Sequence, residues 1–221
     1  QGLTIGKGGS AESTNTAVGF ITLVANTTGT LNTAIGYQNL YYNSTGFFNT
    51  AIGSQAIVDN TTGNENTANG AQALTNNTTG DNNTAVGSQT LTANTTGDDN
   101  TAVGLHALYS NTFGYSNTAN GAYSLLGNNI GVSNTANGYA SLNSNTSGSF
   151  NTAVGYHVLI NNSDGSNNTA IGSFAGTNSS SLSNTTAIGN NATTTASNTI
   201  RLGDAFITSI TGQVDFSFPS D

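Results

Sequence analysis

Small apolar residues recur along this chain at a constant interval, and a larger apolar residue follows each of them after a fixed gap. The small residue is Ala, inside Asn-Thr-Ala-(Val/Ile/Asn)-Gly, and the larger one is Leu or Ile, ahead of Asn-(Thr/Ser)-(Thr/Ser)-Gly. Unbroken phase is typical of a solenoid, because a coil that stacks on the previous one cannot change its length. The Asn that opens each of the ten units lies at Asn15, Asn32, Asn49, Asn66, Asn83, Asn100, Asn117, Asn134, Asn151 and Asn168.

Each unit predicts short β-strands joined by turns. Thr-Ala-Val and Thr-Ala-Ile are β-compatible triplets, and they lie between Asn and Gly, which favour turns. Two glycines recur: the strand Gly directly after the triplet, and the turn Gly that ends Asn-Thr-Thr-Gly, where the turn composition favours a positive φ. The segments between these glycines are too short for a helix of useful length. The sequence therefore predicts an all-β β-solenoid of 17-residue coils.

Stacked coils place equivalent residues in ladders with about 4.8 Å between neighbours. The predicted core consists of the Ala and Leu ladders and the fourth position of the unit, which is mostly Val or Ile. Because Thr at the second position lies on the same side of the strand as the fourth, alternation predicts that Thr also points inward. The fourth position is Asn in three coils. An Asn in a stacked row needs polar partners, so we expect a polar row near an interface, made of Asn69, Asn120 and Asn137.

The ends depart from the repeat, so we expect three regions. Residues 1–14 form an entry coil or N-terminal cap, and residues 15–184 form the ten repeats. Residues 185–221 form terminal coils, in which Asn198-Thr199-Ile200-Arg201-Leu202-Gly203 resumes the motif after a shorter interval, and then an apolar tail. Open ladders at the end of a solenoid need covering, which predicts that the tail is a cap or the junction to a following domain.

Composition narrows the range of partners. Charged residues make up 5% of the chain, and the net charge is −8 with only Lys7 and Arg201 as basic residues. Nucleic acids and anionic membranes attract clustered basic residues, so neither is an expected partner, and no apolar run is long enough to insert into a membrane. Each coil buries few apolar side chains, which favours self-association over a monomer with a thin core.

Residues suited to catalysis or to cofactor binding are not grouped in the sequence. His106 and His157 lie three whole repeats apart and are expected as exposed surface side chains. Asp81, Asp98 and Asp99 follow turn glycines, where acidic residues favour water. A calcium site there is the alternative, although the glycine-rich nonapeptide of calcium-binding β-rolls is missing. We therefore expect no enzyme, no cofactor and no metal site.

Aromatic residues gather toward the two ends of the array and are absent from residues 54–101. Filling of the core is the simplest interpretation. Tyr also offers a flat apolar face with a polar tip, which suits a receptor or a carbohydrate. The group expected to form such a receptor or glycan patch consists of Tyr41, Tyr42, Phe47 and Phe48.

The Asn-Thr-Ala-Ile-Gly core resembles the head repeats of the trimeric autotransporter adhesins, the YadA-like heads. In that family a Val-Ala-Ile-Gly-type strand recurs at a shorter interval in a trimer of left-handed β-solenoids. The shorter interval between Gly189 and Gly203 is closest to the family's own period. The resemblance covers nearly the whole chain and implies a homotrimer of left-handed coils. The longer interval of the ten repeats implies a different coil path, with an enlarged outer turn at Asn-Thr-Thr-Gly.

The tail carries a second resemblance. The stretch from Asn198 to Asp204, followed by Ile207-Thr208-Ser209, is similar to the segment that precedes the self-cleaving intramolecular chaperone of phage tail spikes and fibres. In that family a Ser-Asp pair begins the chaperone, and the chain is cut beside it. Because the sequence ends in Ser220-Asp221, the resemblance implies a processed product from which the chaperone domain is missing.

These observations predict a structural or adhesive fibre segment, the head or stalk of a trimeric surface adhesin or of a phage-type tail fibre. Its expected partners are two further copies of the chain and a cell-surface receptor or glycan. Its expected location is extracellular, on a cell surface or a virion. The alternative is a monomeric β-solenoid that binds ice or glycans, since a regular Thr row on an outward face is the type of surface that ice-binding solenoids present.

Overall fold

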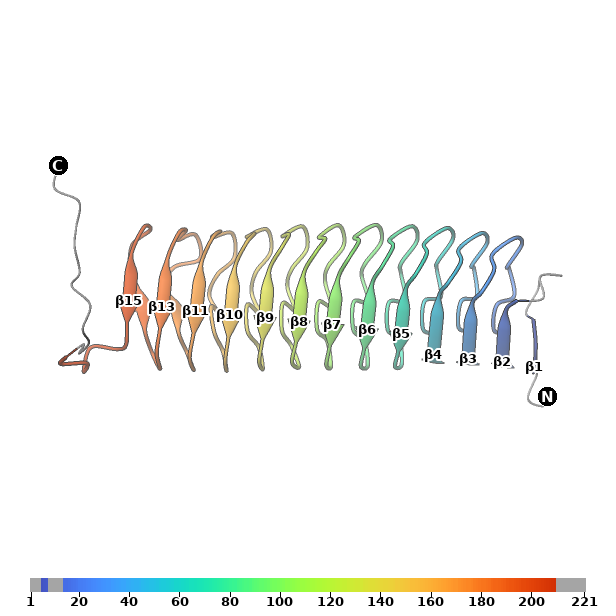
Figure 1. Cartoon of the computed structure of the whole chain (residues 1–221), viewed down its shortest axis with the longest axis horizontal. Coiled ribbons are helices and arrows are strands. Elements are labelled where there is room, and N and C mark those ends of the chain that lie inside the picture. Colours follow the sequence, from blue (N-terminus) through green and yellow to red (C-terminus); the bar gives the residue numbers. More distant parts are fainter. Residues whose placement is uncertain (1–4, 8–13, 210–221) are drawn as a thin grey trace.

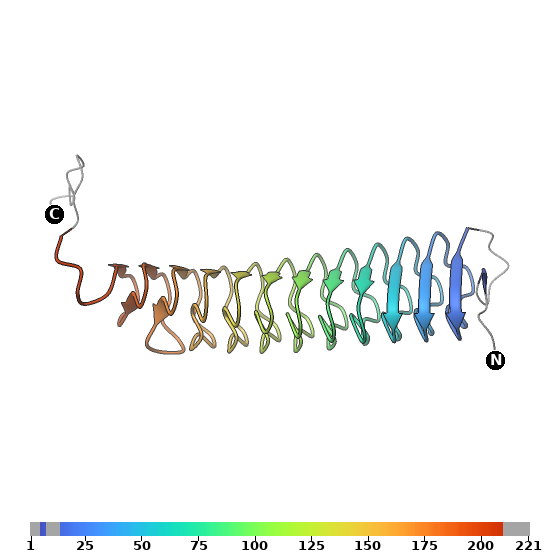
Figure 2. The same cartoon turned by 90° about the horizontal axis from the view of Figure 1, so that it is seen from below.

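The computed structural model describes residues 5–7 and 14–209. They form an all-β solenoid whose coils follow one another along a single long axis (Figures 1 and 2). The described residues form no helix, and therefore none that could cross a membrane. The prediction of a β-solenoid with 17-residue coils is confirmed, because equivalent residues of successive units pair directly.

One short strand from each coil builds the main sheet, in the order β1-β2-β3-β4-β5-β6-β7-β8-β9-β10-β11-β13-β15. All of its neighbouring strands are parallel except β1 and β2, which are antiparallel. A second, two-stranded sheet joins β12 and β14 near the C-terminal end. The strands are β1 Ile5–Gly6, β2 Thr16–Phe20, β3 Thr33–Tyr37, β4 Thr50–Ser54, β5 Thr67–Asn69, β6 Thr84–Val86, β7 Thr101–Val103, β8 Thr118–Asn120, β9 Thr135–Asn137, β10 Thr152–Val154, β11 Thr169–Ile171, β12 Gly176–Thr177, β13 Thr186–Ile188, β14 Thr193–Thr194 and β15 Ile200–Leu202.

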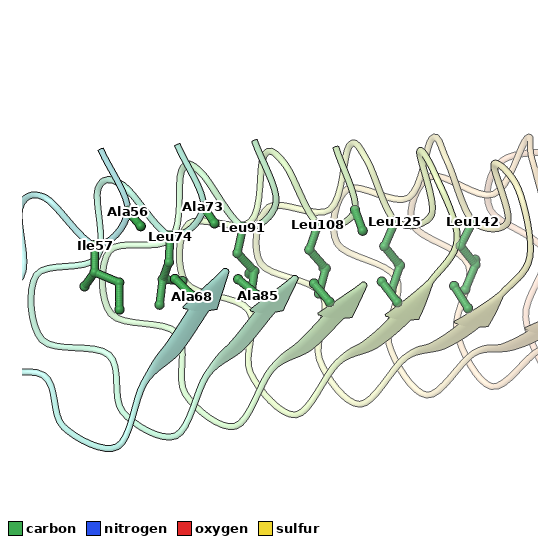
Figure 3. Packing of buried hydrophobic residues seen from close by; sticks show 14 of the residues in the cluster. Ala56, Ile57, Ala68, Ala73, Leu74, Ala85, Leu91, Leu108, Leu125 and Leu142 are labelled. Carbon is green, nitrogen blue, oxygen red and sulfur yellow. The ribbon is translucent and has the colours of Figure 1, made fainter. Parts of the chain in front are cut away.

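The core contains the Ala of each strand and the Leu on the opposite wall of the coil, as predicted. Figure 3 shows the Leu side chains reaching across the coil toward the strands that carry Ala68 and Ala85. The strand Ala is buried in each coil from Ala17 to Ala187, and the Leu row from Leu23 to Leu159, with Ile57 in its place once, is fully or almost fully buried. A third buried row lies next to Leu, where Ala56, Ala73 and Ala107 are fully buried.

The Thr row and the fourth-position row lie outside this core, so the inward orientation predicted for both rows is wrong for the single chain. The three-residue strands are buried only at their central Ala, and their two flanking residues are exposed or half-buried. Alternation along the strand does keep Thr and the fourth position on one side. The narrow interior, filled by Ala from the strand and Leu from the opposite wall, leaves that side facing outward.

Two rows of buried Asn side chains run the length of the coils. One row is the opening Asn and the other is the turn Asn of Asn-Thr-Thr-Gly, and both are almost completely buried. In one coil, Asn49 and Asn60 each donate their side-chain N–H to the carbonyl oxygen of Gly63, at 2.8 Å in both cases. The sequence analysis did not predict that these Asn side chains form part of the core.

The same amides also join neighbouring coils. The side-chain oxygen of Asn49 accepts the backbone N–H of Asn66 at 3.0 Å, and the side-chain N–H of Asn60 donates to the side-chain oxygen of Asn43 at 2.7 Å. No buried side-chain nitrogen or oxygen of the described residues lacks a hydrogen-bond partner. Burial of so many amides is therefore compatible with a stable fold, because every amide is paired.

The turn Gly is required by space, and not by a positive φ as the turn composition predicted. A Cβ at Gly63 would overlap the side-chain oxygen of Asn60 and would lie 2.5 Å from the carbonyl oxygen of Gly80. Positive φ occurs instead at the strand Gly and at non-glycine residues, among them the buried Leu74, at φ 54°. The left-handed conformation is unfavourable for such side chains, so stacking of the coils has to impose it.

The ends of the array differ from its repeats. At the N-terminal end Ile5 pairs with Val18 in the antiparallel β1–β2 ladder. At the C-terminal end β15 pairs with β13 so that Ile200 lies opposite Thr186, a shorter step along the chain than in the repeats. The segment from Ala205 to Ser209 is exposed. The apolar residues Ile210, Val214, Phe216 and Phe218, which belong to the predicted tail, lie outside the described residues, as do Ser220 and Asp221.

Neighbouring asparagines offer a matched test of the Asn ladders. Asn77 is fully buried and bonds to Asn60, Gly80 and Asn94, whereas Asn76 is exposed. Asn77→Ala leaves several buried polar groups without a partner and should lower the free energy of unfolding by about 2–4 kcal/mol. Asn76→Ala should change it by less than about 0.5 kcal/mol. Chemical denaturation of both variants at one protein concentration measures the difference; equal losses would show that the buried ladder has no special role.

Candidate functional site

The predicted aromatic patch consists of two separate pairs of rings on one coil. Tyr41 and Tyr42 meet edge to face with centroids 4.7 Å apart, and Phe47 and Phe48 do so at 5.5 Å. Tyr42 and Phe48 are 53% and 52% exposed. The turn of the coil separates the pairs, and no ring contact joins them within the described chain. These side chains are therefore available to a partner, but as two small sites.

Asp59 lies one coil beyond Tyr42, at the equivalent position of the next unit. The two coils are joined there by a backbone hydrogen bond of 3.0 Å from the N–H of Tyr42 to the carbonyl oxygen of Val58. Burial raises the pKa of the Asp59 carboxyl above its ordinary value, because desolvation disfavours the charged form. This carboxylate is the only described group with such a shift.

The predicted polar row is exposed on the outer face of the main sheet. Asn120 and Asn137 are register partners in adjacent strands, whereas Asn69 lies three coils away, paired with Ile52 and Val86. The structure therefore brings two of the three residues together. In the single chain, all three of these Asn residues are exposed.

The acidic residues of the spacer link neighbouring coils. The side-chain oxygen of Asp81 accepts the backbone N–H of Asn64 at 2.7 Å, and that of Asp98 accepts the backbone N–H of Asp81 at 2.8 Å. Within the described ranges, no three His, Cys, Asp or Glu side chains are grouped as metal ligands. The role visible for Asp81 and Asp98 is thus to satisfy backbone donors of the preceding coil.

A ladder of glutamine side chains follows the strand Gly in four successive coils, and sequence analysis missed it. Each side-chain N–H donates to the side-chain oxygen of the preceding Gln, at 2.9 to 3.3 Å. His106 occupies the next position, and its Nε2 lies 2.6 Å from the side-chain oxygen of Gln89. We call this row the Gln ladder: Gln38, Gln55, Gln72 and Gln89.

Rings continue the same surface beyond His106, in what we call the aromatic strip. The rings of Tyr139 and Tyr156 are stacked at 5.4 Å, and those of Tyr156 and His157 at 4.1 Å. Unbroken ring contacts connect all members of the strip, which are His106, Tyr109, Tyr123, Tyr139, Tyr156, His157 and Phe174.

The aromatic strip corrects two expectations. No described aromatic residue is buried, so aromatic side chains do not fill the core. His106 and His157 are half-buried by neighbouring rings and are not fully exposed. Part of the signal was in the sequence, because aligning the second residue after each strand Gly places the four Gln residues, His106 and Tyr123 in one row. Comparing equivalent positions of successive repeats, in place of residues close together in the sequence, would have revealed this row.

Comparison with known proteins found no match, either to a protein-family model or to a curated protein.

The raised pKa of Asp59 predicts a pH-dependent stability. A folded-state pKa above the unfolded one means that the folded chain binds more protons, so stability falls as the pH rises from the ordinary value of 3.8 through the raised pKa. Asp59→Asn should therefore be more stable than the parent at neutral pH and equally stable in acid. Thermal unfolding at a series of pH values measures this. Asp164→Asn, which removes a charge from an exposed turn, serves as the control; a similar gain there would assign the effect to net charge.

Proposed function

We propose that this chain is a segment of a homotrimeric fibre, the head or stalk of a surface adhesin or phage-type tail fibre, and that it presents a receptor-binding surface. The observation that carries the proposal is the outer face of the main sheet. We define the outer sheet face as the Thr row together with the fourth-position row.

The outer sheet face is long, regular and uncharged. Its Val and Ile side chains are half-buried or exposed, with 37% exposure at Ile52 and Val103 and 43% at Ile171. No Asp, Glu, Lys or Arg occurs in either row from Thr16 to Ile188. Exposed Val and Ile side chains that recur in one row over this many coils are typical of an interface, because monomeric proteins rarely leave large apolar surfaces in water.

A second copy of the chain is the partner that fits this face best. Its rows repeat at the same spacing of about 4.8 Å, so that every Val, Ile and Thr meets an equivalent neighbour along the whole length. Asn120 and Asn137 would then bond to their counterparts around the axis, which satisfies the polar groups that burial would otherwise leave unpaired. The resemblance to YadA-like heads supports three copies and left-handed coils.

A rigid trimer of this kind suits adhesion outside the cell. Three copies of a weak binding site on one fibre raise the overall avidity without any new contact. The absence of Cys and Met removes the most easily oxidised side chains, in keeping with an extracellular place on a cell surface or virion.

The mass in solution tests the proposal. Light scattering of the parent chain should give three times the 22.2 kDa of one chain. The double variant Ile52→Asp with Val103→Asp places charges on the outer sheet face and should shift the particle to a monomer, because burying unpaired carboxylates is unfavourable.

The matched control is Thr62→Asp with Thr96→Asp, which adds the same charges at exposed turn positions. This variant should keep the mass of the parent, and circular dichroism should show β-structure in all three proteins. A monomeric parent, or an equal loss of mass in both variants, would contradict assembly through the outer sheet face.

The outward orientation of the Thr row favours a second candidate function, ice binding by a monomer. In-register Thr side chains, such as Thr84 and Thr101, repeat along the sheet on a face without charge, which is the kind of array that can match an ice lattice. This function predicts thermal hysteresis in a monomeric sample. Thr84→Tyr with Thr101→Tyr should abolish it, and Thr62→Tyr should not. A trimer without hysteresis would exclude this candidate.

A further inference from the structure

We infer that the Gln ladder and the aromatic strip together form a binding track for a linear, neutral glycan chain. The inference rests on the proposed function, because it names the receptor class of the surface that the fibre presents. The rows that form it do not include Phe47 or Phe48, whereas Tyr41 holds the same position in its unit as Tyr109 of the aromatic strip.

The track is continuous along the solenoid axis. From Gln38 to His106 it advances four coils, and from His106 to Phe174 four more. At about 4.8 Å per coil, each half is about 19 Å long. Contacts within each half are unbroken, and the bond between Gln89 and His106 joins the two. A narrow track of this length, with one repeat per coil, suits a linear polymer better than a globular protein.

The aromatic strip supplies exposed apolar surface with polar tips. Tyr139, Tyr156 and Phe174 are 45%, 48% and 49% exposed although they contact one another. Mutual contact holds these rings in place, so that little side-chain entropy remains to be lost when a ligand binds. Sugars present apolar C–H faces beside hydroxyl groups, and Tyr provides a ring and a hydroxyl that match both.

The Gln ladder supplies hydrogen-bond donors and acceptors. A Gln amide has two N–H groups and an oxygen with two lone pairs. In Gln55 and Gln72, one N–H bonds to the preceding Gln and the oxygen accepts one bond from the next. Each amide therefore retains an N–H and a lone pair, and it is held in position by the ladder. Such a row can bond to successive hydroxyl groups of a glycan.

Charge selects a neutral glycan over an acidic one. Neither the Gln ladder nor the aromatic strip contains Lys, Arg, Asp or Glu, and the two basic residues of the chain lie near its ends. Sulfated or carboxylated glycans would find no Lys or Arg on the track and would be repelled by the net charge of −8.

Binding to immobilised polysaccharides tests the inference. The full chain, in its native oligomeric state, is applied to cellulose, mannan, dextran and galactan, with heparin as the polyanionic comparator. We expect binding to at least one neutral polymer and none to heparin. Tyr139→Ser with Tyr156→Ser should weaken this binding at least tenfold, and Tyr139→Phe with Tyr156→Phe, which keeps the rings, should retain most of it.

The matched control is Phe48→Ser with Phe150→Ser, which removes two rings of at least equal exposure at another position of the unit, outside the track. This variant should bind as the parent does. Loss of binding in the control alone, equal loss in both Ser variants, binding to heparin only, or no binding to any neutral polymer would each overturn the inference. Light scattering on the same samples separates the two proposals. If the protein is a monomer and still binds through the track, the proposal of a trimer is wrong and the inference of a glycan site stands.

Discussion

The structure depends on the carbonyl group of the turn Gly, which two buried Asn side chains of the same coil bind at once. In the coil that begins at Asn66, for example, Asn66 and Asn77 both donate to Gly80, at 2.8 and 2.9 Å. One donor comes from the start of the coil and the other from its turn, so the shared acceptor closes the coil on itself. Because the same amides also bond to the neighbouring coils, closure and stacking are a single hydrogen-bond network, and its members reinforce one another.

This network explains why the repeat admits no change of length. An added residue would move one Asn away from its acceptor and leave buried polar groups unpaired, at a cost comparable to that of a core mutation. The Asn network also explains how Leu residues such as Leu74 can be held in a left-handed backbone conformation although the apolar core is thin. Regular stacking determines the coil path, and the apolar ladders of Ala and Leu fill the space that remains.

The side chains of the surface rows do not belong to the Asn network. These rows differ in how much their residue types vary from coil to coil. The Thr row is constant from Thr16 to Thr186, in keeping with the proposed homotrimer. The row after the strand Gly changes along the chain from Gln to His and aromatic residues. One scaffold therefore carries both a uniform row, which suits the proposed assembly, and a variable row, which suits the proposed glycan track.

Much of this fold could be predicted from the sequence, because period, turn residues and apolar phase are local properties. They determined the β-solenoid, its coil length, and the Ala and Leu ladders. The tertiary structure alone decided which side of the Thr-Ala-Val triplet faces inward, since alternation groups Thr with Val but does not state which side is enclosed. It also decided that Asn60 belongs to the core and that His106 and Tyr123 are neighbours. Residues one repeat apart become neighbours only when coils stack, so the Gln ladder and aromatic strip, distant in sequence, are defined by stacking and not by any local motif.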